Sequence, residues 1–294
     1  MSIAIIINPV AGGARIDRAH TRADIASSVV ERQGVPAEIF VTERRGHAHE
    51  LTAAAVGRGV SLVIAWGGDG TVSEVGSALA FSRTALGIVP AGSGNGLARE
   101  LGVDPRPERA IVQAIQAVPR SMDVGELEGR LFLNLAGIGF DAHVASAFDD
   151  PKNRHRGFLR YAGITARSLW SYQPAEYSIT TAERHIHVRA VIVTVANSAQ
   201  FGNGARIAPG ARVDDGKLDL VVIEERARWR TVIQLPRLFI GTVDRVAGYS
   251  LARIASATIE SDRPMLFHVD GEPVLGGTRL RARVHPSALR IAVK

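Results

Sequence analysis

Short apolar segments, three of which end in a glycine-rich loop, place the strongest constraint on how this chain folds. The expected strands are Ile3–Ile7, Ala37–Thr42, Leu62–Trp66 and Leu86–Val89, and the expected helices between them include His47–Arg58 and Val72–Ala80. Continuous runs of β-branched residues are typical of strands buried on both faces of a sheet. Strands that alternate with helices predict an α/β domain with a mostly parallel sheet and helices on both faces.

The pattern changes after about Pro119, where strand-like segments separated by turn residues dominate. These segments are Leu131–Leu135, Tyr177–Thr181, His185–Ala196, Leu218–Ile223, Ala257–Ser261, Met265–Val269, Leu280–Val284 and Leu289–Val293, with helical segments at Arg156–Ser171 and Trp229–Ile240. Such spacing predicts an antiparallel β-rich domain. We therefore expect an α/β nucleotide-binding domain at residues 1–120 and a β-rich domain at residues 121–294, whose C-terminal end is a candidate to return to the first domain.

Composition limits the classes of function. The 294 residues suit two domains, and the 46% hydrophobic and 22% charged residues are ordinary for a globular protein. The absence of cysteine excludes disulfide scaffolds, thiol catalysis and zinc–thiolate sites. The formal charge of +6 suits nucleic acid, anionic lipid or a phosphorylated substrate.

The sequence lacks the usual features of secreted, membrane-spanning and nucleic-acid-binding proteins. The first apolar run has no basic leader, and no apolar stretch reaches the roughly 20 residues of a membrane span. We expect a soluble cytoplasmic protein that at most attaches to the inner face of a membrane. A nucleic-acid partner is not expected, because no recognisable binding fold or aromatic platform occurs.

Three glycine-rich loops follow expected strands, at Asn8–Gly13, Gly67–Thr71 and Gly92–Gly96. Ligands of open parallel sheets bind beyond the carboxyl ends of the strands. A single loop of this kind is as often a plain tight turn, but three on one edge favour a phosphate site, because glycines let backbone amides approach a polyphosphate. The sequence has neither G-x-x-x-x-G-K-[ST] nor a G-x-G-x-x-G after the first strand, so the common phosphate loops are excluded.

Asp69 lies inside one of these loops, between two glycines and before Thr71. A carboxylate there would repel phosphate unless a divalent cation lay between them, and Mg²⁺ bridging carboxylate and phosphate oxygens is the expected chemistry. The alternative is that Asp69 caps the helix that begins near Thr71.

Gly67-Gly68-Asp69-Gly70-Thr71 resembles the signature of the diacylglycerol kinase catalytic domain. Sphingosine and ceramide kinases share this domain, and NAD kinases and phosphofructokinases are more distant relatives. The resemblance continues through Asn8-Pro9 with Gly12-Gly13, Pro90–Asn95, Asp123–Gly125, Asn134, Gly137–Asp141, Asp214–Asp219 and Asp270–Glu272. It implies an NAD kinase- and phosphofructokinase-like α/β domain followed by an antiparallel β-sandwich-like domain.

The resemblance also implies an activity and residue roles. The implied reaction is ATP-dependent phosphorylation of a lipid alcohol, with diacylglycerol giving phosphatidic acid and Mg²⁺ as the cofactor. Asp69 would serve the magnesium nucleotide, Glu272 would be the general base, and Asp215 would hold a structural Mg²⁺ with main-chain oxygens of Arg212 and Lys217. The implied ATP contacts are Asn8, Gly12, Thr42, Gly67, Gly68, Asp69, Gly70, Thr71, Val72, Ser73, Gly92, Ser93 and Asn95.

Considered without the resemblance, two of these motifs stay ambiguous. Glu272 follows a strand and could accept a hydroxyl proton across a cleft, but Asp270-Gly271 is also an ordinary hairpin turn with exposed acids. The Asp214–Asp219 cluster offers hard oxygen ligands for Mg²⁺ or Ca²⁺, or it is a solvated hairpin tip. Differences from the family pattern at Ala11, Arg15 and Thr242–Asp244 bear on substrate preference more than on chemistry.

A lipid acceptor predicts contact with a membrane surface. Residues 152–172 combine five Lys and Arg residues with interfacial aromatic residues, and Arg226, Arg228, Trp229 and Arg230 form a smaller cluster. The alternative is a core-packed amphipathic helix with a solvated basic face. Two other functions stay open, an NAD kinase-like enzyme and a nucleotide- or lipid-binding protein without turnover, and a homodimer is an alternative to a monomer.

Overall fold

The structure is a computed structural model that describes residues 2–13, 18–149, 168, 172–202, 204–227, 234 and 236–293. The chain forms two compact units. The first contains Met1–Met122 together with Ser287–Lys294, and the second contains Asp123–Pro286. The last residues of the chain are thus part of the N-terminal unit.

The first unit is built on a parallel sheet. Its strands are β1 (Ile3–Ile7), β2 (Ala37–Val41), β3 (Leu62–Gly67) and β4 (Ala85–Pro90), in the order β4-β3-β1-β2. All neighbours in this order are parallel. Arg290 and Ile291, at the end of β17 (Arg279–Ile291), pair with the outer side of β4, also in parallel. The expectation of a parallel α/β sheet is confirmed.

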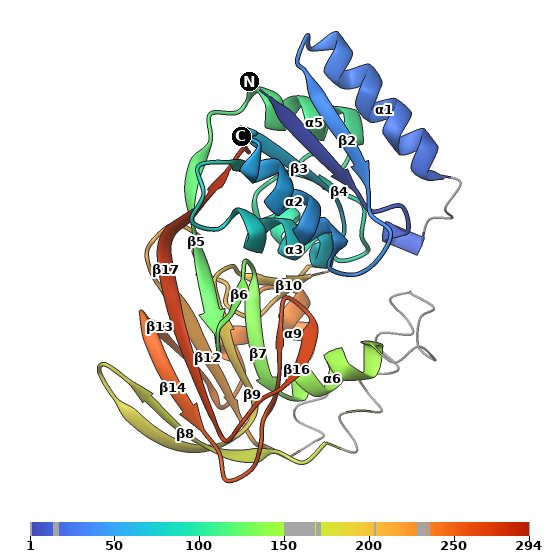
Figure 1. The fold of residues 1–294 in the computed structure, drawn as a ribbon. Helices are drawn as coiled ribbons and strands as arrows, with labels where there is room; N and C mark the ends of the chain where they lie inside the picture. The colour runs from blue at the N-terminus through green and yellow to red at the C-terminus, as the bar shows by residue number, and fades with distance from the viewer. Residues whose placement is uncertain are drawn as a thin grey trace. The chain divides into compact units, whose positions relative to one another are not determined.

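Helices cover both faces of this sheet (Figure 1). The helical elements are η1 (Ala11–Gly13), α1 (Arg18–Arg32), α2 (His47–Gly57), α3 (Asp69–Leu79), α4 (Gly96–Glu100) and α5 (Pro107–Gln116). On one face α1 and α5 pack on the strands, and on the other face α2 and α3 do so. The strand isoleucines explain this arrangement, since Ile3 and Ile5 are fully buried against Val29 of α1 and Ile111 of α5.

The second unit is an antiparallel β structure. Its elements are β5 (Arg120–Leu127), β6 (Arg130–Phe132), β7 (Leu135–Gly139), α6 (Phe140–Asp149), β8 (Ala175–Thr181), β9 (His185–Ala196), β10 (Gln200–Gly202), β11 (Ala205–Arg206), β12 (Leu218–Glu224), α9 (Pro236–Phe239), η3 (Val243–Arg245), β13 (Tyr249–Ile254), β14 (Ser256–Glu260), β15 (Leu266–Val269), β16 (Glu272–Leu275) and most of β17. Neighbouring strands run in the order β16-β15-β7-β9-β8-β14-β17, and β12 joins β9 to β13.

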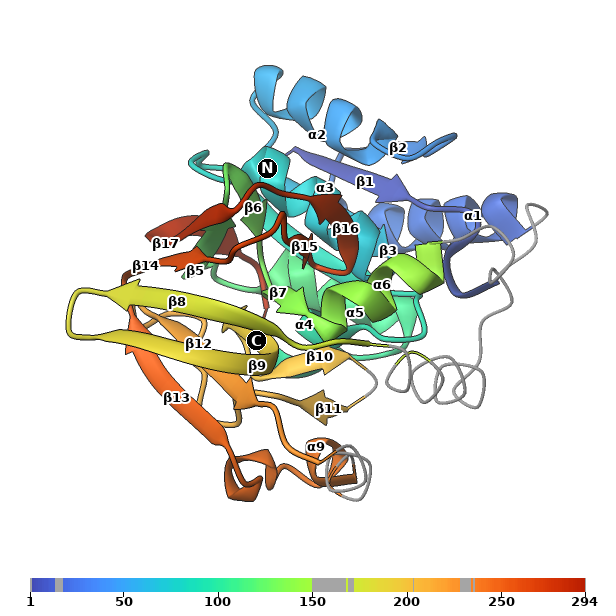
Figure 2. The ribbon, with the colours of Figure 1, turned by 90° about the horizontal axis from the view of Figure 1, so that it is seen from below.

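Alternating side chains make the core of this unit. Tyr177 and Ile179 of β8 are buried while Ser178 between them is more exposed, and the two buried residues pack with Val193 and Leu220 from β9 and β12. Figure 2 shows β8, β9, β12 and β13 side by side, in agreement with their antiparallel pairing. The predicted antiparallel β-rich fold is confirmed.

One expected strand and two expected helices differ from the structure or lie partly outside the described residues. Leu131–Leu135 is not one strand, because strand pairing is interrupted between β6 and β7. The backbone N–H groups of residues 133–135 donate hydrogen bonds to the carboxylate of Asp270. The expected helix 156–171 lies outside the described residues except for Ser168. Of the expected helix 229–240, the described part contains α9.

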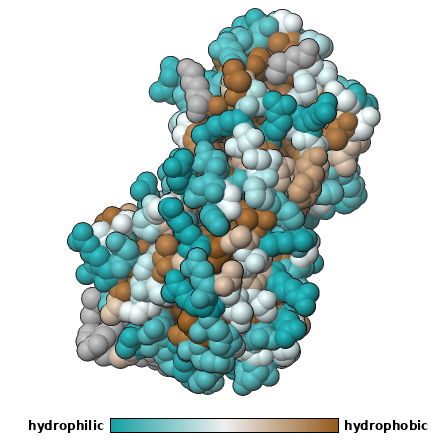
Figure 3. All heavy atoms as spheres, turned by 90° about the vertical axis from the view of Figure 1, so that its left-hand side faces the viewer, coloured by the Kyte–Doolittle hydropathy of each residue, from teal (hydrophilic) through white to brown (hydrophobic). Residues whose placement is uncertain are grey.

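Within the described part of the chain, no helix is long and apolar enough to cross a membrane. The face drawn in Figure 3 carries mostly polar residues, with apolar residues in small separate areas.

Candidate active site

Three loops of the first unit meet at the carboxyl ends of β1, β3 and β4. The strands are parallel and in register, so the residues that follow Ile7, Gly67 and Pro90 emerge at one edge of the sheet. Trp66 and Asn8 are linked by a backbone hydrogen bond of 2.9 Å, and Gly67 and Ala91 by one of 2.8 Å. The sheet itself therefore brings the three predicted loops together.

Side-chain contacts tie the first loop to the second. The Asn8 amide donates to the Thr71 hydroxyl at 2.9 Å, and its oxygen accepts the Val10 N–H at 3.1 Å. Arg22 of α1 donates to the carbonyls of Asn8 and Ala11 and thereby holds the same loop from the helix side. Arg22 was not predicted, because a helical arginine gives no sequence signal of such a contact.

Two close backbone approaches require glycine in these loops. Gly12 has φ 72°, and a β-carbon there would lie 2.3 Å from the carbonyl oxygen of Ala91. A β-carbon on Gly92 would lie 2.7 Å from the Cα of Gly68. Any larger residue at these positions would force the loops apart.

Asp69 joins the second loop to the third. Its two carboxylate oxygens accept the N–H groups of Asn95 and Gly96 at 2.8 and 2.7 Å, at the start of α4. Asp69 is the first residue of α3 and Gly68 is the N-cap, so Asp69 does not occupy the N-cap position of this helix. Asp69 instead holds the start of the next helix.

The electrostatic balance at Asp69 is set by burial. Burial raises the pKa of the Asp69 carboxyl above its ordinary value of 3.8, while the amides of Gly96 and Asn95 and the charge of Arg99 act in the opposite direction. Asn95 has φ 49°, and its side chain both accepts the Gly92 N–H and donates to the Gly92 carbonyl at 2.8 Å. These contacts fix the third loop.

The other predicted nucleotide contacts occupy different environments. Thr42 is buried at the end of β2, where its N–H donates to Ile7 at 2.8 Å. Val72 is buried in α3, and Ser73 is half-buried. Gly70, in the first turn of α3, and Ser93, in the third loop, are exposed and thus accessible to a ligand.

Glu74 is a further residue that the sequence did not single out. Its carboxylate accepts the N–H groups of Gly46 and Ala48 at 2.9 and 3.2 Å, which satisfies amides at the start of α2. Gly46 lies in the loop between β2 and α2, four residues after Thr42. The hydrogen bond from Gly46 to Glu74 therefore also holds this loop in place.

In the second unit, Glu272 follows a two-residue hairpin turn. Val269 and Glu272 are paired on β15 and β16, and the two residues between them have φ values of 47° and 88°. Positive φ at both central residues defines a type I′ turn, for which Asp-Gly is a preferred sequence. The predicted hairpin is present, and Glu272 is half-buried at its end.

The carboxylate of Asp270, in the same turn, is hydrogen-bonded to the protein backbone. Its carboxylate accepts the N–H groups of Leu133, Asn134 and Leu135 at 2.9, 2.9 and 3.1 Å, and its own N–H donates to Leu135 at 2.9 Å. Asp270 therefore locks the turn before Glu272 onto the segment between β6 and β7.

The Asp214–Asp219 segment forms a second ordered turn in this unit. Asp215 accepts the Lys217 N–H at 3.1 Å, and the buried carboxylate of Asp123 accepts the Gly216 N–H at 2.6 Å. Arg212 contacts Asp214 at 3.5 Å. The turn is thus held by internal bonds and by Asp123, another residue of the quoted motifs.

Asp215 and Asp219 place carboxylate oxygens, the ligand type that hard cations take, next to Arg253. One Asp219 oxygen is buried and has no hydrogen-bond partner among the described residues, and it lies 3.8 Å from the Nε of Arg253, whose Nη1 is 4.0 Å from Asp215. Burial raises the pKa of Asp219, with Arg253 opposing the shift. The described residues contain no group of three or more His, Cys, Asp or Glu that could hold a metal, so a cation here would also need main-chain or water oxygens.

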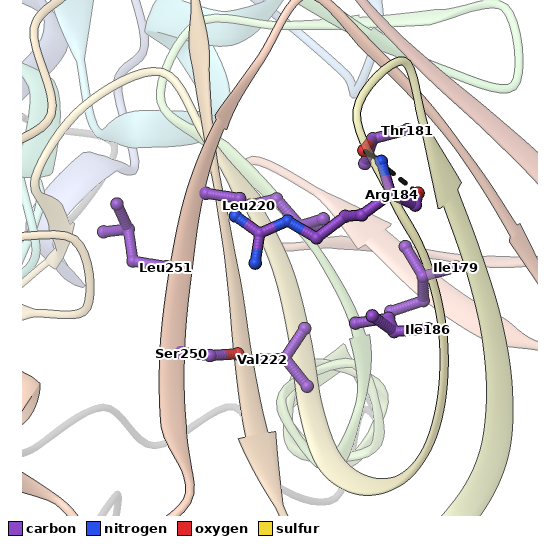
Figure 4. Close-up of a pocket in the computed structure, with 9 residues that line it drawn as sticks. Ile179, Thr181, Arg184, Ile186, Leu220, Val222, Ser250 and Leu251 are labelled. Carbon is purple, nitrogen blue, oxygen red and sulfur yellow. Dashed lines mark hydrogen bonds between the residues drawn. The ribbon is translucent and has the colours of Figure 1, made fainter.

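A cavity of about 20 Å³ lies elsewhere in the second unit, where the β8–β9 hairpin faces β12 and β13 (Figure 4). Ile179, Ile186, Leu220 and Val222 supply most of its apolar lining, and Arg184 extends over it. None of its described lining residues is acidic. We therefore assign no phosphoryl-transfer chemistry to it.

Several predicted features fall on residues that are not described. Arg15 lies outside the described residues, as do Arg228, Trp229 and Arg230. Of the basic and aromatic segment 152–172, only Ser168 and Tyr172 are described.

Comparison with known proteins agrees with the geometry. Residues 2–127 match the model of the diacylglycerol kinase catalytic domain, and residues 134–293 match that of the YegS C-terminal NAD kinase beta sandwich-like domain. The protein named "Probable lipid kinase YegS-like" of Chromohalobacter salexigens is 31% identical over 90% of this chain and 86% of its own length. Its namesake in Pseudomonas aeruginosa strain PAO1 is 30% identical over 95% and 91%.

Solved structures show the same fold. A crystal structure described as a diacylglycerol kinase from Bacillus anthracis str. Sterne covers 100% of this chain and 97% of that chain, with 20% identity and a TM-score of 0.75. A second crystal structure from the same strain has 24% identity and a TM-score of 0.80, and covers 100% and 95%.

The fold and the three glycine loops define a kinase with the diacylglycerol kinase catalytic domain. The chain belongs to the YegS-like lipid kinases of the diacylglycerol kinase family. The resemblance drawn from the sequence motifs is thereby confirmed.

Proposed function

We propose that this protein transfers the γ-phosphate of ATP to the hydroxyl group of a lipid alcohol, and that diacylglycerol is the acceptor. The observation that carries the proposal is the meeting of three glycine loops at one sheet edge in a chain of the YegS-like family. The product from diacylglycerol would be phosphatidic acid, a precursor of phospholipids.

The first unit supplies the nucleotide site. Backbone amides of the glycine loops and the N-terminal end of α3 offer hydrogen-bond donors and positive potential to the phosphates. Both Asp69 oxygens accept amides at the start of α4. We therefore assign Asp69 to holding the third loop against the nucleotide.

Mg²⁺ bound to ATP would supply positive charge to the phosphates. In the second unit, Asp215 and Asp219, with main-chain oxygens of Arg212 and Lys217, would hold a structural cation that neutralises the two carboxylates. The buried Asp219 oxygen without a hydrogen-bond partner in the described chain supports this assignment.

Glu272 is the proposed general base. As the lipid oxygen forms its bond to the γ-phosphorus, the bond between that phosphorus and the oxygen it shares with the β-phosphate breaks. The hydroxyl proton passes to Glu272, and ADP leaves with the electrons of the broken bond.

The experiment is a product analysis with the full chain, MgCl₂, γ-labelled ATP and separate acceptors. The acceptors are diacylglycerol and sphingosine in vesicles, a total lipid extract, and NAD. Labelled phosphatidic acid identified by mass spectrometry is the expected result, with faster turnover on anionic than on zwitterionic vesicles because the chain carries a formal charge of +6. Labelled NADP alone, or ATP binding without any product, would overturn the proposal.

The base assignment has its own test. Glu272→Gln should lower kcat by about 100-fold or more, since a general base contributes about 10²–10⁴-fold. Glu183→Gln, at an exposed position of the β8–β9 hairpin, is the matched control and should keep full activity. Full activity of Glu272→Gln would remove the base assignment while leaving the kinase function in place.

A further inference from the structure

We propose that His268 is a positioning residue that sets the backbone of the turn before Glu272, and that Asp141 holds His268 in the tautomer this task requires. The proposal rests on the proposed role of Glu272. Its structural part stands on contacts within the second unit alone.

His268 contacts the turn directly. It is 4% exposed on β15, and its Nδ1 accepts the N–H of Gly271 at 3.2 Å. An imidazole nitrogen accepts a hydrogen bond only when it carries no proton, so the ring proton of neutral His268 is on Nε2. The hydrogen bond to Gly271 therefore selects one tautomer.

Asp141 faces the other side of the ring. Its Oδ2 lies 3.6 Å from His268 Nε2, and the side chain is almost fully buried. The same oxygen accepts the Thr194 hydroxyl at 3.0 Å, and Oδ1 accepts the Ala142 N–H at 2.8 Å. A fixed carboxylate next to Nε2 favours the proton on that nitrogen and leaves Nδ1 free to accept from Gly271.

Gly137 on β7 makes room for this pair. A β-carbon at Gly137 would lie 1.9 Å from Asp141 Oδ2 and 2.6 Å from His268 Nε2. The two polar side chains thus occupy the space that a side chain at this strand position would need.

The Gly271 contact controls the orientation of Glu272. Gly271 is the second residue of the I′ turn, so rotation of its peptide would move the first residue of β16. Asp270 fixes one end of the turn through three amides, and His268 fixes the other through one. Loss of the His268 contact would loosen Glu272 while the hairpin stays paired.

Two substitutions separate the contacts of the two ring nitrogens. The oxygen of Asn in His268→Asn lies near the position of Nδ1 and can accept from Gly271, whereas the amide of His268→Gln reaches toward Asp141 and leaves Gly271 without its acceptor. We expect His268→Asn to keep kcat within about threefold. His268→Gln should lower kcat by about tenfold or more at an unchanged KM for ATP, because small displacements of a reacting group cost up to about 10²-fold.

Amide hydrogen exchange supplies a readout that does not depend on catalysis. The Gly271 amide should exchange faster in His268→Gln than in the wild-type protein and in His268→Asn. Thermal unfolding of both variants is the control, since a purely structural histidine would predict equal losses of stability and activity for the two.

A milder variant covers the case in which His268→Gln does not fold. Thr194→Val removes the hydroxyl that holds Asp141 and leaves His268 intact, and it should accelerate Gly271 exchange in the same direction. Equal Gly271 exchange in all folded variants overturns this inference even if Glu272→Gln is inactive. If Glu272→Gln keeps full activity while Gly271 exchange still responds, the general base is wrong and the positioning contact stands.

Discussion

The sequence singled out Asp69, but its hydrogen-bond partners in the structure are not the ones that the sequence suggested. Its place between glycines indicated a metal-linked carboxylate, but the structure gives both oxygens to backbone amides at the start of α4. The sequence signal was the glycine loop itself. The partners lie 26 and 27 residues away and depend on how β3 and β4 align, which no local pattern encodes.

Substitution of Asp69 by Asn tests this role. The Asn side chain has only one acceptor oxygen, so its NH₂ group would face the N–H group of either Asn95 or Gly96 and leave that donor without an acceptor. We expect ATP affinity to fall by about tenfold and the free energy of unfolding to fall by about 1–3 kcal/mol, the usual cost of an unsatisfied buried group. Calorimetric ATP titration and urea unfolding measure both, with the exposed Asp24→Asn as the control. Unchanged affinity would show that the third loop does not depend on this carboxylate.

At the scale of elements, β1, β3 and β4 of the first unit were predictable because they are short apolar segments buried on both faces. The break at Leu133 and Asn134 was not, since it depends on Asp270, more than 130 residues later. The short strand β16 was likewise missed, because Glu272–Leu275 lacks an alternating pattern and is defined by its pairing with β15.

Glu126 links β5 to β17 and gives a pH prediction. Burial raises the pKa of Glu126, but hydrogen bonds from Arg283 and His285, both at 2.8 Å, outweigh it and lower the pKa below its ordinary 4.5. A lowered folded-state pKa gives stability that is present above the unfolded pKa and lost as the pH falls through the folded one. Glu126→Gln should therefore cost about 1 kcal/mol at pH 7, given that Arg283 is largely exposed.

Urea unfolding as a function of pH measures this effect. The difference between wild type and Glu126→Gln should shrink as the pH falls below about 4.5. Glu183→Gln should show no such acid-dependent difference. A constant difference at all pH values would mean that packing of the side chain, rather than its charge, stabilises the β5–β17 contact.

At the scale of the whole molecule, the first unit is assembled from both ends of the chain. Ile291 pairs with Leu86 of β4, the Ala292 N–H donates to Leu86 at 2.8 Å, and Leu289 and Ile291 are fully buried. A chain that ends at Pro286 should lose about 3–6 kcal/mol from the first unit, at about 1.5–3 kcal/mol for each of these two side chains.

Thermal unfolding followed by Trp66 fluorescence measures this loss, with Trp170 and Trp229 replaced by Phe so that Trp66 of β3 is the one reporter. The expected result is an earlier transition in the shortened chain. Removal of Lys294 alone is the control. An unchanged transition would mean that the last strand adds nothing to the stability of this unit.

This arrangement has a consequence for biosynthesis. A ribosome releases the residues that complete the sheet of the first unit only after it has synthesised the whole second unit. During synthesis of the second unit, the edge of β4 that pairs with Arg290 and Ile291 therefore has no partner strand. Termination of translation between Pro286 and Arg290 would release a polypeptide with a complete second unit and an unfinished sheet in the first unit.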